Sequence, residues 1–172
     1  NGPNGDKELL EVVNQVGLDL DKIRYEPGRN HQERIADDSH PYMRADLSKC
    51  INCYRCVRAC DEIQGQQVLG MHGRGFENRI IMGADVNFQD SPCVSCGACS
   101  QTCPTGAITD IYSPRRHEAN RTQRTVCSYC GVGCNLEVHA KDHEILSIPA
   151  PKPAAANTGH TCLKGRYAFR FQ

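Results

Sequence analysis

The chain has 172 residues, 12 of them cysteine, and a formal net charge of zero. This charge balance gives no electrostatic basis for binding nucleic acid or an anionic membrane surface. No apolar run approaches the roughly 18 residues that a membrane span needs, and the polar start shows no signal-peptide pattern. We therefore expect no nucleic-acid partner, no membrane span and a cytoplasmic location.

Cysteine supplies much of the apolar content of this chain. The hydrophobic fraction is 39% with cysteine included, which leaves a thin apolar core for the length. Disulfide scaffolds are usually shorter than about 100 residues and spread their cysteines through loops. Here the cysteines fall in three tight groups, and such close neighbours converge on a metal more readily than they pair with one another. We predict that all twelve are metal ligands.

Residues 1–45 contain no cysteine and are expected to be a helical connecting segment. Asp6 can cap a helix, and Gly17 would end it. The apolar residues between them recur near helical spacing at Leu9, Leu10, Val12, Val13 and Val16. We expect this helix to pack and to lead into the metal-binding part. Because the chain starts at Asn1 instead of methionine, we also expect it to be part of a longer polypeptide.

Residues 46–112 hold two cysteine runs of the same form, an internal repeat. The runs are Cys50-x2-Cys53-x2-Cys56-x3-Cys60 and Cys93-x2-Cys96-x2-Cys99-x3-Cys103-Pro104. This is the spacing of bacterial ferredoxins, in which three close thiolates bind one 4Fe-4S cluster and the fourth reaches the other cluster. The predicted ligand sets are Cys50, Cys53, Cys56 and Cys103 for one cluster, and Cys93, Cys96, Cys99 and Cys60 for its neighbour.

A pair of zinc sites is the alternative for these runs, but zinc favours two C-x2-C pairs separated by a long gap. The resemblance to two-cluster ferredoxins extends to Cys103-Pro104-Thr105-Gly106-Ala107. Two departures stand out. Cys60 is followed by Asp61 instead of proline, and the segment from Cys60 to Cys93 is longer than a minimal ferredoxin needs. An inserted strand pair would explain this length.

Residues 113–124 contain four arginines and one glutamate and have no hydrophobic period. We expect a solvated linker here, and a docking strip for an acidic neighbour is the alternative. A further module is expected over residues 125–172. Its segment 149–156 contains repeated prolines and should be a loop, because proline excludes regular pairing.

The third cysteine set, Cys127-x2-Cys130-x3-Cys134-x27-Cys162, has wider spacing and predicts a single cluster in another domain. The segments that carry it are Val126-Cys127-Ser128-Tyr129-Cys130-Gly131-Val132-Gly133-Cys134 and Cys162-Leu163-Lys164-Gly165. They resemble the N-terminal iron–sulfur domain of molybdopterin-dependent oxidoreductases. With a ferredoxin module ahead of it, the order resembles the α subunit of multi-cluster, NAD-linked formate dehydrogenases.

This resemblance implies an α+β fold, with a two-cluster ferredoxin-like domain followed by the small 4Fe-4S domain of a molybdopterin oxidoreductase. It implies three 4Fe-4S clusters and a bis-molybdopterin guanine dinucleotide with molybdenum or tungsten, bound mostly outside this segment. Lys164 would lie between the third cluster and a pterin ring and help electrons pass. Gly131 and Gly133 would let the backbone approach that cluster. The partners would be the rest of the catalytic subunit and a flavin- or NAD-reducing subunit, so this segment would conduct electrons and hold no formate-binding residue.

Other functions share parts of this pattern. An enzyme like nitrate reductase shares the third set but usually lacks the ferredoxin module, and an iron-only hydrogenase shares only the ferredoxin part. A stand-alone ferredoxin would leave residues 113–172 without a role. The histidines are scattered without ligand spacing, and we expect surface positions for His40, His72, His139, His143 and His160. No haem-attachment or dinucleotide motif occurs.

Overall fold

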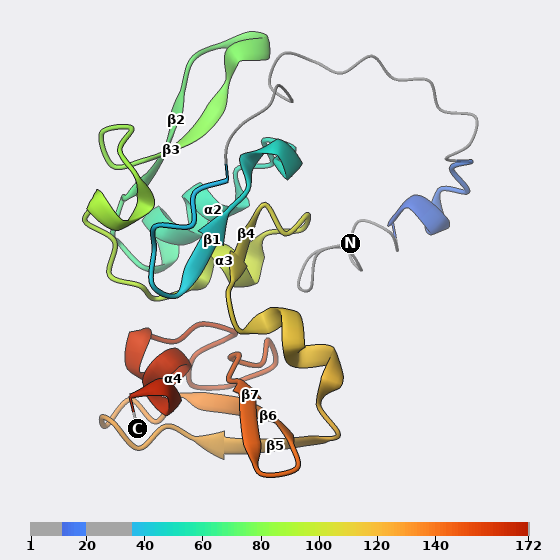
Figure 1. Cartoon of the computed structure of the whole chain (residues 1–172), viewed down its shortest axis with the longest axis vertical. Helices are drawn as coiled ribbons and strands as arrows, with labels where there is room; N and C mark the ends of the chain where they lie inside the picture. The colour runs from blue at the N-terminus through green and yellow to red at the C-terminus, as the bar shows by residue number, and fades with distance from the viewer. Residues whose placement is uncertain (1–11, 20–35, 172) are drawn as a thin grey trace.

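Two modules of mixed helix and strand follow one another along the chain (Figure 1). The computed structural model describes residues 12–19 and 36–171. The first module runs from strand β1 to strand β4, and the second holds strands β5 to β7 and helix α4. These short helices and strands confirm the predicted α+β class. In the described residues, the helices are all too short or too polar to cross a membrane.

Each cysteine run of the first module contains a short helix. Helix α2 (Arg55–Arg58) holds Cys56 and continues in a wider turn over Ala59–Ile63, and helix α3 (Ala98–Thr102) holds Cys99. Strand β1 (Met43–Ala45) pairs antiparallel with strand β4 (Ile108–Asp110). Because β1 precedes the first run and β4 follows the second, this pairing brings the two runs together. The buried core includes Met43, Ile80, Phe88 and Ile108.

A β-hairpin fills the long segment between Cys60 and Cys93. Strand β2 (Leu69–His72) pairs antiparallel with strand β3 (Arg79–Met82). The turn between them requires Gly73, which has a φ of +80° and whose added Cβ would lie 2.6 Å from a backbone carbonyl oxygen. The hairpin confirms that an inserted strand pair lengthens this segment.

The second module is a three-stranded antiparallel sheet followed by a short helix. Strands β5 (Arg121–Val126), β6 (Asn135–Lys141) and β7 (Glu144–Ser147) pair in chain order. Residues 148–160 form a loop, as the prolines predict, and lead to helix α4 (Leu163–Tyr167) and a 3-10 turn over Ala168–Arg170.

The expected linker over residues 113–124 is largely regular structure, and that prediction was wrong. Residues Ser113–Glu118 form a 3-10 helix, and β5 begins at Arg121. The arginines of this segment are drawn into ion pairs with the sheet: Arg115 lies 2.7 Å from Glu144, and Arg124 lies 3.6 Å from Glu137. A segment without hydrophobic period is therefore ordered here by strand pairing and by charge.

A short helical turn over residues 12–15 belongs to the predicted N-terminal helix. Gly17 ends it with a φ of +64°, while its N–H donates to the Asn14 carbonyl and the Leu18 N–H donates to the Val13 carbonyl. This confirms Gly17 as the helix end, whereas Asp6 lies outside the described residues. Val16 is 70% exposed, so the expected packing of the helix is not seen within the described chain.

Aromatic side chains join the two modules. Tyr42, next to β1, stacks on Tyr167 of α4 with ring centroids 4.6 Å apart and planes 12° apart. Tyr112, which follows β4, lies 6.1 Å from the Tyr167 ring and 5.7 Å from the Phe169 ring. Tyr167 is 1% exposed. Its burial between segments of both modules fixes how α4 meets the first module.

Candidate metal centres

The first candidate centre is a cavity lined by four cysteines from both runs. Cys50, Cys53 and Cys56 come from the first run, and Cys103 comes from the end of the second. The other walls of this space are mainly apolar side chains such as Leu47, Ile51, Ile80 and Ile108. Four thiols around one apolar space suit a 4Fe-4S cluster, which takes four cysteine thiolates. The structure thus brings together the cysteines that the spacing predicts as one ligand set.

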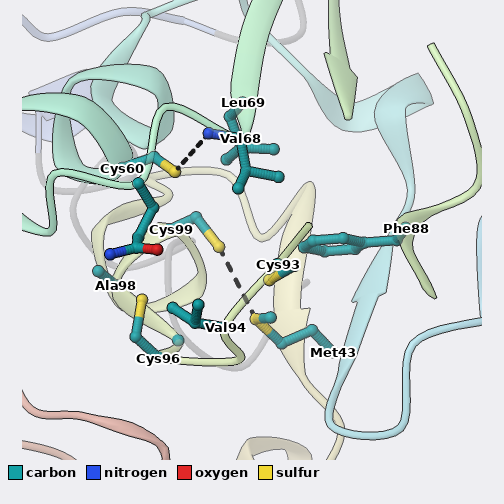
Figure 2. A pocket seen from close by; sticks show the side chains of 12 residues that line it. Met43, Cys60, Val68, Leu69, Phe88, Cys93, Val94, Cys96, Ala98 and Cys99 are labelled. Atoms are coloured by element: carbon teal, nitrogen blue, oxygen red, sulfur yellow. Dashed lines mark hydrogen bonds between the residues drawn. The ribbon is translucent and has the colours of Figure 1, made fainter. Parts of the chain in front are cut away.

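The second candidate centre is built in the same way, with the contributions of the two runs exchanged (Figure 2). Its cavity is lined by Cys93, Cys96 and Cys99 of the second run and by Cys60 of the first. The close-up shows these four side chains around a common space, with Met43, Val68, Leu69 and Phe88 closing it. The Val68 N–H donates to the Cys60 sulfur at 3.3 Å. The chain crossing that exchanges the fourth cysteine of each run is therefore present in the fold.

The two runs share one backbone conformation, which aims their sulfurs. Asn52 and Tyr54 have left-handed φ angles of 52° and 63°, and Ser95 and Gly97 repeat them at 55° and 73°. The Asn52 N–H lies 3.4 Å from the Cys50 sulfur, and the Ser95 N–H lies 3.3 Å from the sulfur of Cys93. Backbone donors to thiolate sulfur stabilise the ligated form and help set the reduction potential of a cluster.

Burial makes these thiols hard to ionise in the absence of a metal. It raises the pKa of Cys56 to about 12, and the nearby Cys103, Cys50 and Cys53 add to the rise. Burial likewise raises the pKa of Cys99 far above its ordinary value. Iron would replace the protons and cancel the charge that burial and mutual repulsion disfavour. The donor set therefore fits a metal cluster better than it fits four bare thiolates.

All twelve cysteines are free thiols, so none forms a disulfide in this structure. Within the described residues, no three histidine, cysteine or carboxylate side chains converge closely enough to hold a single metal ion.

His40 supports the second centre, and the expectation that it is a surface residue was wrong. It is 5% exposed, and its Nδ1 accepts the N–H groups of Tyr42 and Met43, each at 3.1 Å. Its Nε2 lies 3.1 Å from the Ser95 hydroxyl, within the loop of the second run. Burial lowers the pKa of His40, so the neutral ring that accepts two N–H groups is favoured. No local sequence signal marks this contact, because Ser95 lies far along the chain.

His139 is also buried, at 6% exposure, with Nε2 2.9 Å from a carboxylate oxygen of Glu137. The surface prediction was therefore wrong for this residue as well. His72 and His143 are exposed as predicted, and His160 is half-buried.

The third cysteine set gathers at one end of the second module. Cys127, Cys130 and Cys134 lie on the connection between β5 and β6, where the Cys127 N–H donates to the Cys134 carbonyl at 2.8 Å. Cys162 immediately precedes α4. Burial raises the pKa of Cys134, and the electrostatic influence of Cys127, Cys130 and Cys162 adds to the rise, so the four thiols share one neighbourhood. This set is more open than the others, since Cys130 and Cys162 are exposed.

Three further residues were predicted beside the third set. Gly133 has a φ of +66°, which favours glycine and turns the chain back toward Cys134. Gly131 has open space around it, with nothing within 4 Å of an added Cβ, so a close approach by a cofactor would meet no steric bar there. Lys164 is exposed on the first turn of α4, two residues after Cys162.

Two sequence families match the two modules. Residues 49–107 match the family described as "4Fe-4S dicluster domain". Residues 120–172 match the family described as "Molybdopterin oxidoreductase Fe4S4 domain". The matched ranges contain all twelve cysteines, eight in the first and four in the second.

Whole-chain similarity extends to longer proteins. The chain is 31% identical to "Probable oxidoreductase YjgC" of Bacillus subtilis over 98% of its own length and 21% of that protein. It is 29% identical to a "Putative formate dehydrogenase" of Staphylococcus aureus (strain USA300), over 96% of the chain and 20% of that protein. The chain therefore spans about a fifth of the length of these relatives.

A solved structure is similar over the larger part of the chain. It is described as "NAD+-reducing [NiFe]-hydrogenase in the H2-reduced state", with a TM-score of 0.52 and 25% identity. The similarity covers 64% of this chain and 44% of the other. Taken with the two cysteine-lined cavities, the matched families show that the chain carries a 4Fe-4S dicluster domain followed by the Fe4S4 domain of a molybdopterin oxidoreductase.

Proposed function

We propose that the chain passes electrons through three 4Fe-4S clusters, between the molybdopterin site of a formate dehydrogenase and a flavin- or NAD-linked partner. The observation that carries this proposal is the grouping of all twelve cysteines into three sets of four. Two sets surround cavities in the first module, and the third set lies in the second module. We propose each set as the complete ligand shell of one cluster.

The proposed domain limits differ from the sequence prediction at two points. We propose a two-cluster domain that starts with β1 at Met43 instead of at residue 46 and ends at residue 112, because β1 pairs with β4. We propose a single-cluster domain that starts with β5 at Arg121 instead of at residue 125.

The cofactor beyond the third cluster would be a bis-molybdopterin guanine dinucleotide with molybdenum or tungsten, which supplies the two-electron oxidation of formate when it is bound. Lys164 is exposed beside Cys162, and we propose that its ammonium group lies between the third cluster and that cofactor. The open backbone at Gly131 and the left-handed turn at Gly133 would allow close packing around the same cluster.

Formate and NAD are favoured by the names of two similar proteins, one called a formate dehydrogenase and one called NAD+-reducing. The third cysteine set argues against a hydrogenase or a simple ferredoxin, because it belongs to the molybdopterin oxidoreductase domain. Nitrate reduction is the alternative within that family.

In the full-length enzyme without oxygen, formate should bleach the cluster absorption, whereas reoxidation of reduced clusters by nitrate would favour the alternative.

The number of clusters can be counted directly. The 172-residue chain, purified without oxygen, should contain about twelve irons and about twelve acid-labile sulfides. Replacing Cys127 and Cys130 together with serine should lower both values to about eight, because only the third cluster loses ligands. About eight irons in the unchanged chain, with the third set open to alkylation, would contradict the proposal.

Lys164→Ala should slow reduction of the iron–sulfur chain by formate while leaving all clusters assembled. The lysine ligates no iron, but its positive charge and N–H donors would bridge two anionic centres. Rapid-mixing kinetics on the full-length enzyme measures this step. Lys141→Ala is a suitable control, because Lys141 is an exposed lysine of β6 whose ion pair with Glu118, at 3.5 Å, should contribute little. Equal rates in both variants would make Lys164 a bystander.

A further inference from the structure

Arg166 of α4 crosses from the second module to the second cysteine run. It is 3% exposed, although arginine is rarely buried without a partner. Its side-chain Nε donates to the backbone carbonyl of Cys96 at 3.1 Å. Its backbone N–H donates to the carbonyl of Cys162 at 3.2 Å. One residue thus bonds to a predicted ligand of the second cluster and to a predicted ligand of the third.

Gln101 holds the Arg166 guanidinium in this position. The Arg166 Nη2 donates to the Gln101 side-chain oxygen, and the Gln101 side-chain nitrogen donates to the Ala150 carbonyl at 2.6 Å. The amide of Gln101 therefore bridges Arg166 on α4 and the loop after β7. These hydrogen bonds restrict the conformations of the Arg166 side chain and hold it against the Cys96 carbonyl.

The second run is shaped to receive Arg166, and the first run is not. A Cβ at Gly97 would lie 2.6 Å from both Cδ and Nε of Arg166, and 2.8 Å from the Tyr167 hydroxyl. The equivalent residue of the first run is Tyr54, which has a similar left-handed φ but is exposed. The internal repeat therefore differs at Gly97, where a side chain would exclude the arginine.

The buried charge of Arg166 also needs an explanation. The groups that accept its side-chain hydrogen bonds are a carbonyl and a neutral amide, and none of the ion pairs found among the described residues involves Arg166. A buried cation is costly unless negative charge lies close by. Thiolate-bound iron–sulfur clusters at the second and third sites would supply that charge.

We propose that Arg166 is the positioning residue that couples the third cluster to the second one, and that electrons pass between these two clusters and not directly from the third to the first. This inference rests on the proposed three-cluster function. In each transfer one electron leaves one cluster and enters the other, so one is oxidised as the other is reduced and no proton is required. Arg166 supplies a bonded path through two hydrogen bonds, and its charge favours the reduced state of both clusters.

Two substitutions separate the charge from the side-chain hydrogen bonds. Arg166→Met removes the charge and the side-chain bonds and leaves the backbone bond to Cys162 in place. It should shift the reduction potentials of the second and third clusters downward and slow transfer between them severalfold. Arg166→Lys keeps the charge but cannot reproduce the planar, forked donors, so the potentials should largely recover while transfer stays slow. The measurements are potentiometric titration and freeze-quench EPR after photoreduction of the full-length enzyme. Arg170→Met is the matched control, since Arg170 lies 4.6 Å over the Tyr112 ring and is exposed.

Unchanged potentials and transfer rates in both Arg166 variants, with all clusters assembled, would overturn the inference. If Arg166→Met assembles fewer clusters, Gln101→Leu decides, because it releases the guanidinium without altering a charge or a ligand; slower transfer supports the coupling role and a wild-type rate overturns it. A wild-type enzyme that lacks the third cluster would instead overturn the proposed function, and iron analysis distinguishes the two cases.

Discussion

Replacing Cys60 with alanine should damage the cluster of the second run, although Cys60 belongs to the first. Its sulfur lines the cavity of Cys93, Cys96 and Cys99, and the Val68 N–H already donates to it there. Cys103→Ala should have the reciprocal effect on the cluster held by Cys50, Cys53 and Cys56. Each variant should lose up to about four irons, because a cubane with three ligands is open to attack and loss.

Spectroscopy that resolves the two sites, such as EPR of the reduced protein together with iron analysis, measures the outcome. The two variants act as controls for each other, since each removes one buried thiol at the same place in the repeat. Damage by each substitution to the cluster of its own run would refute the crossed ligand sets.

Tyr167→Ala should destabilise the contact between the modules by about 3–5 kcal/mol, the usual cost of removing a fully buried aromatic side chain. The ring is 1% exposed and stacks on Tyr42, so its removal leaves a cavity at the centre of the interface. We expect a lower unfolding midpoint in denaturant, measured without oxygen on protein with matched iron content. We also expect faster proteolysis between the modules.

Tyr167→Phe is the matched control for this prediction. The Tyr167 hydroxyl is buried and has no hydrogen-bond partner among the described residues. Phenylalanine keeps the stacked ring and removes a polar group whose burial is uncompensated, so this variant should be as stable as the wild type or more stable. A loss of stability equal to that of the alanine variant would show that the hydroxyl, and not ring packing, holds the interface.

Cysteine spacing alone determined the local form of the metal-binding loops. A two-residue gap leaves few backbone conformations that place both sulfurs at one centre. Both runs adopt the same conformation, as the left-handed φ angles at Asn52 and Ser95 show. The exchange of Cys60 and Cys103 follows from the same spacing, because a three-residue gap turns the fourth sulfur away. The inserted hairpin and the helix end at Gly17 were also predictable, since turns and helix ends are set by neighbouring residues.

Only the tertiary structure decided which surfaces meet. The contact of His40 with Ser95 joins residues 55 apart in sequence, and that of Arg166 with Cys96 joins residues 70 apart. Neither residue stands in a pattern that marks it, because a side chain's partner across the fold depends on how whole elements pack. The sequence of residues 113–124 predicted a solvated linker because it does not show the distant partners of its arginines. In the structure, strand pairing and ion pairs order that segment. Short-range spacing thus specified how each group of cysteines is built, and long-range packing specified how the groups are joined, because only a folded chain brings such distant residues into contact.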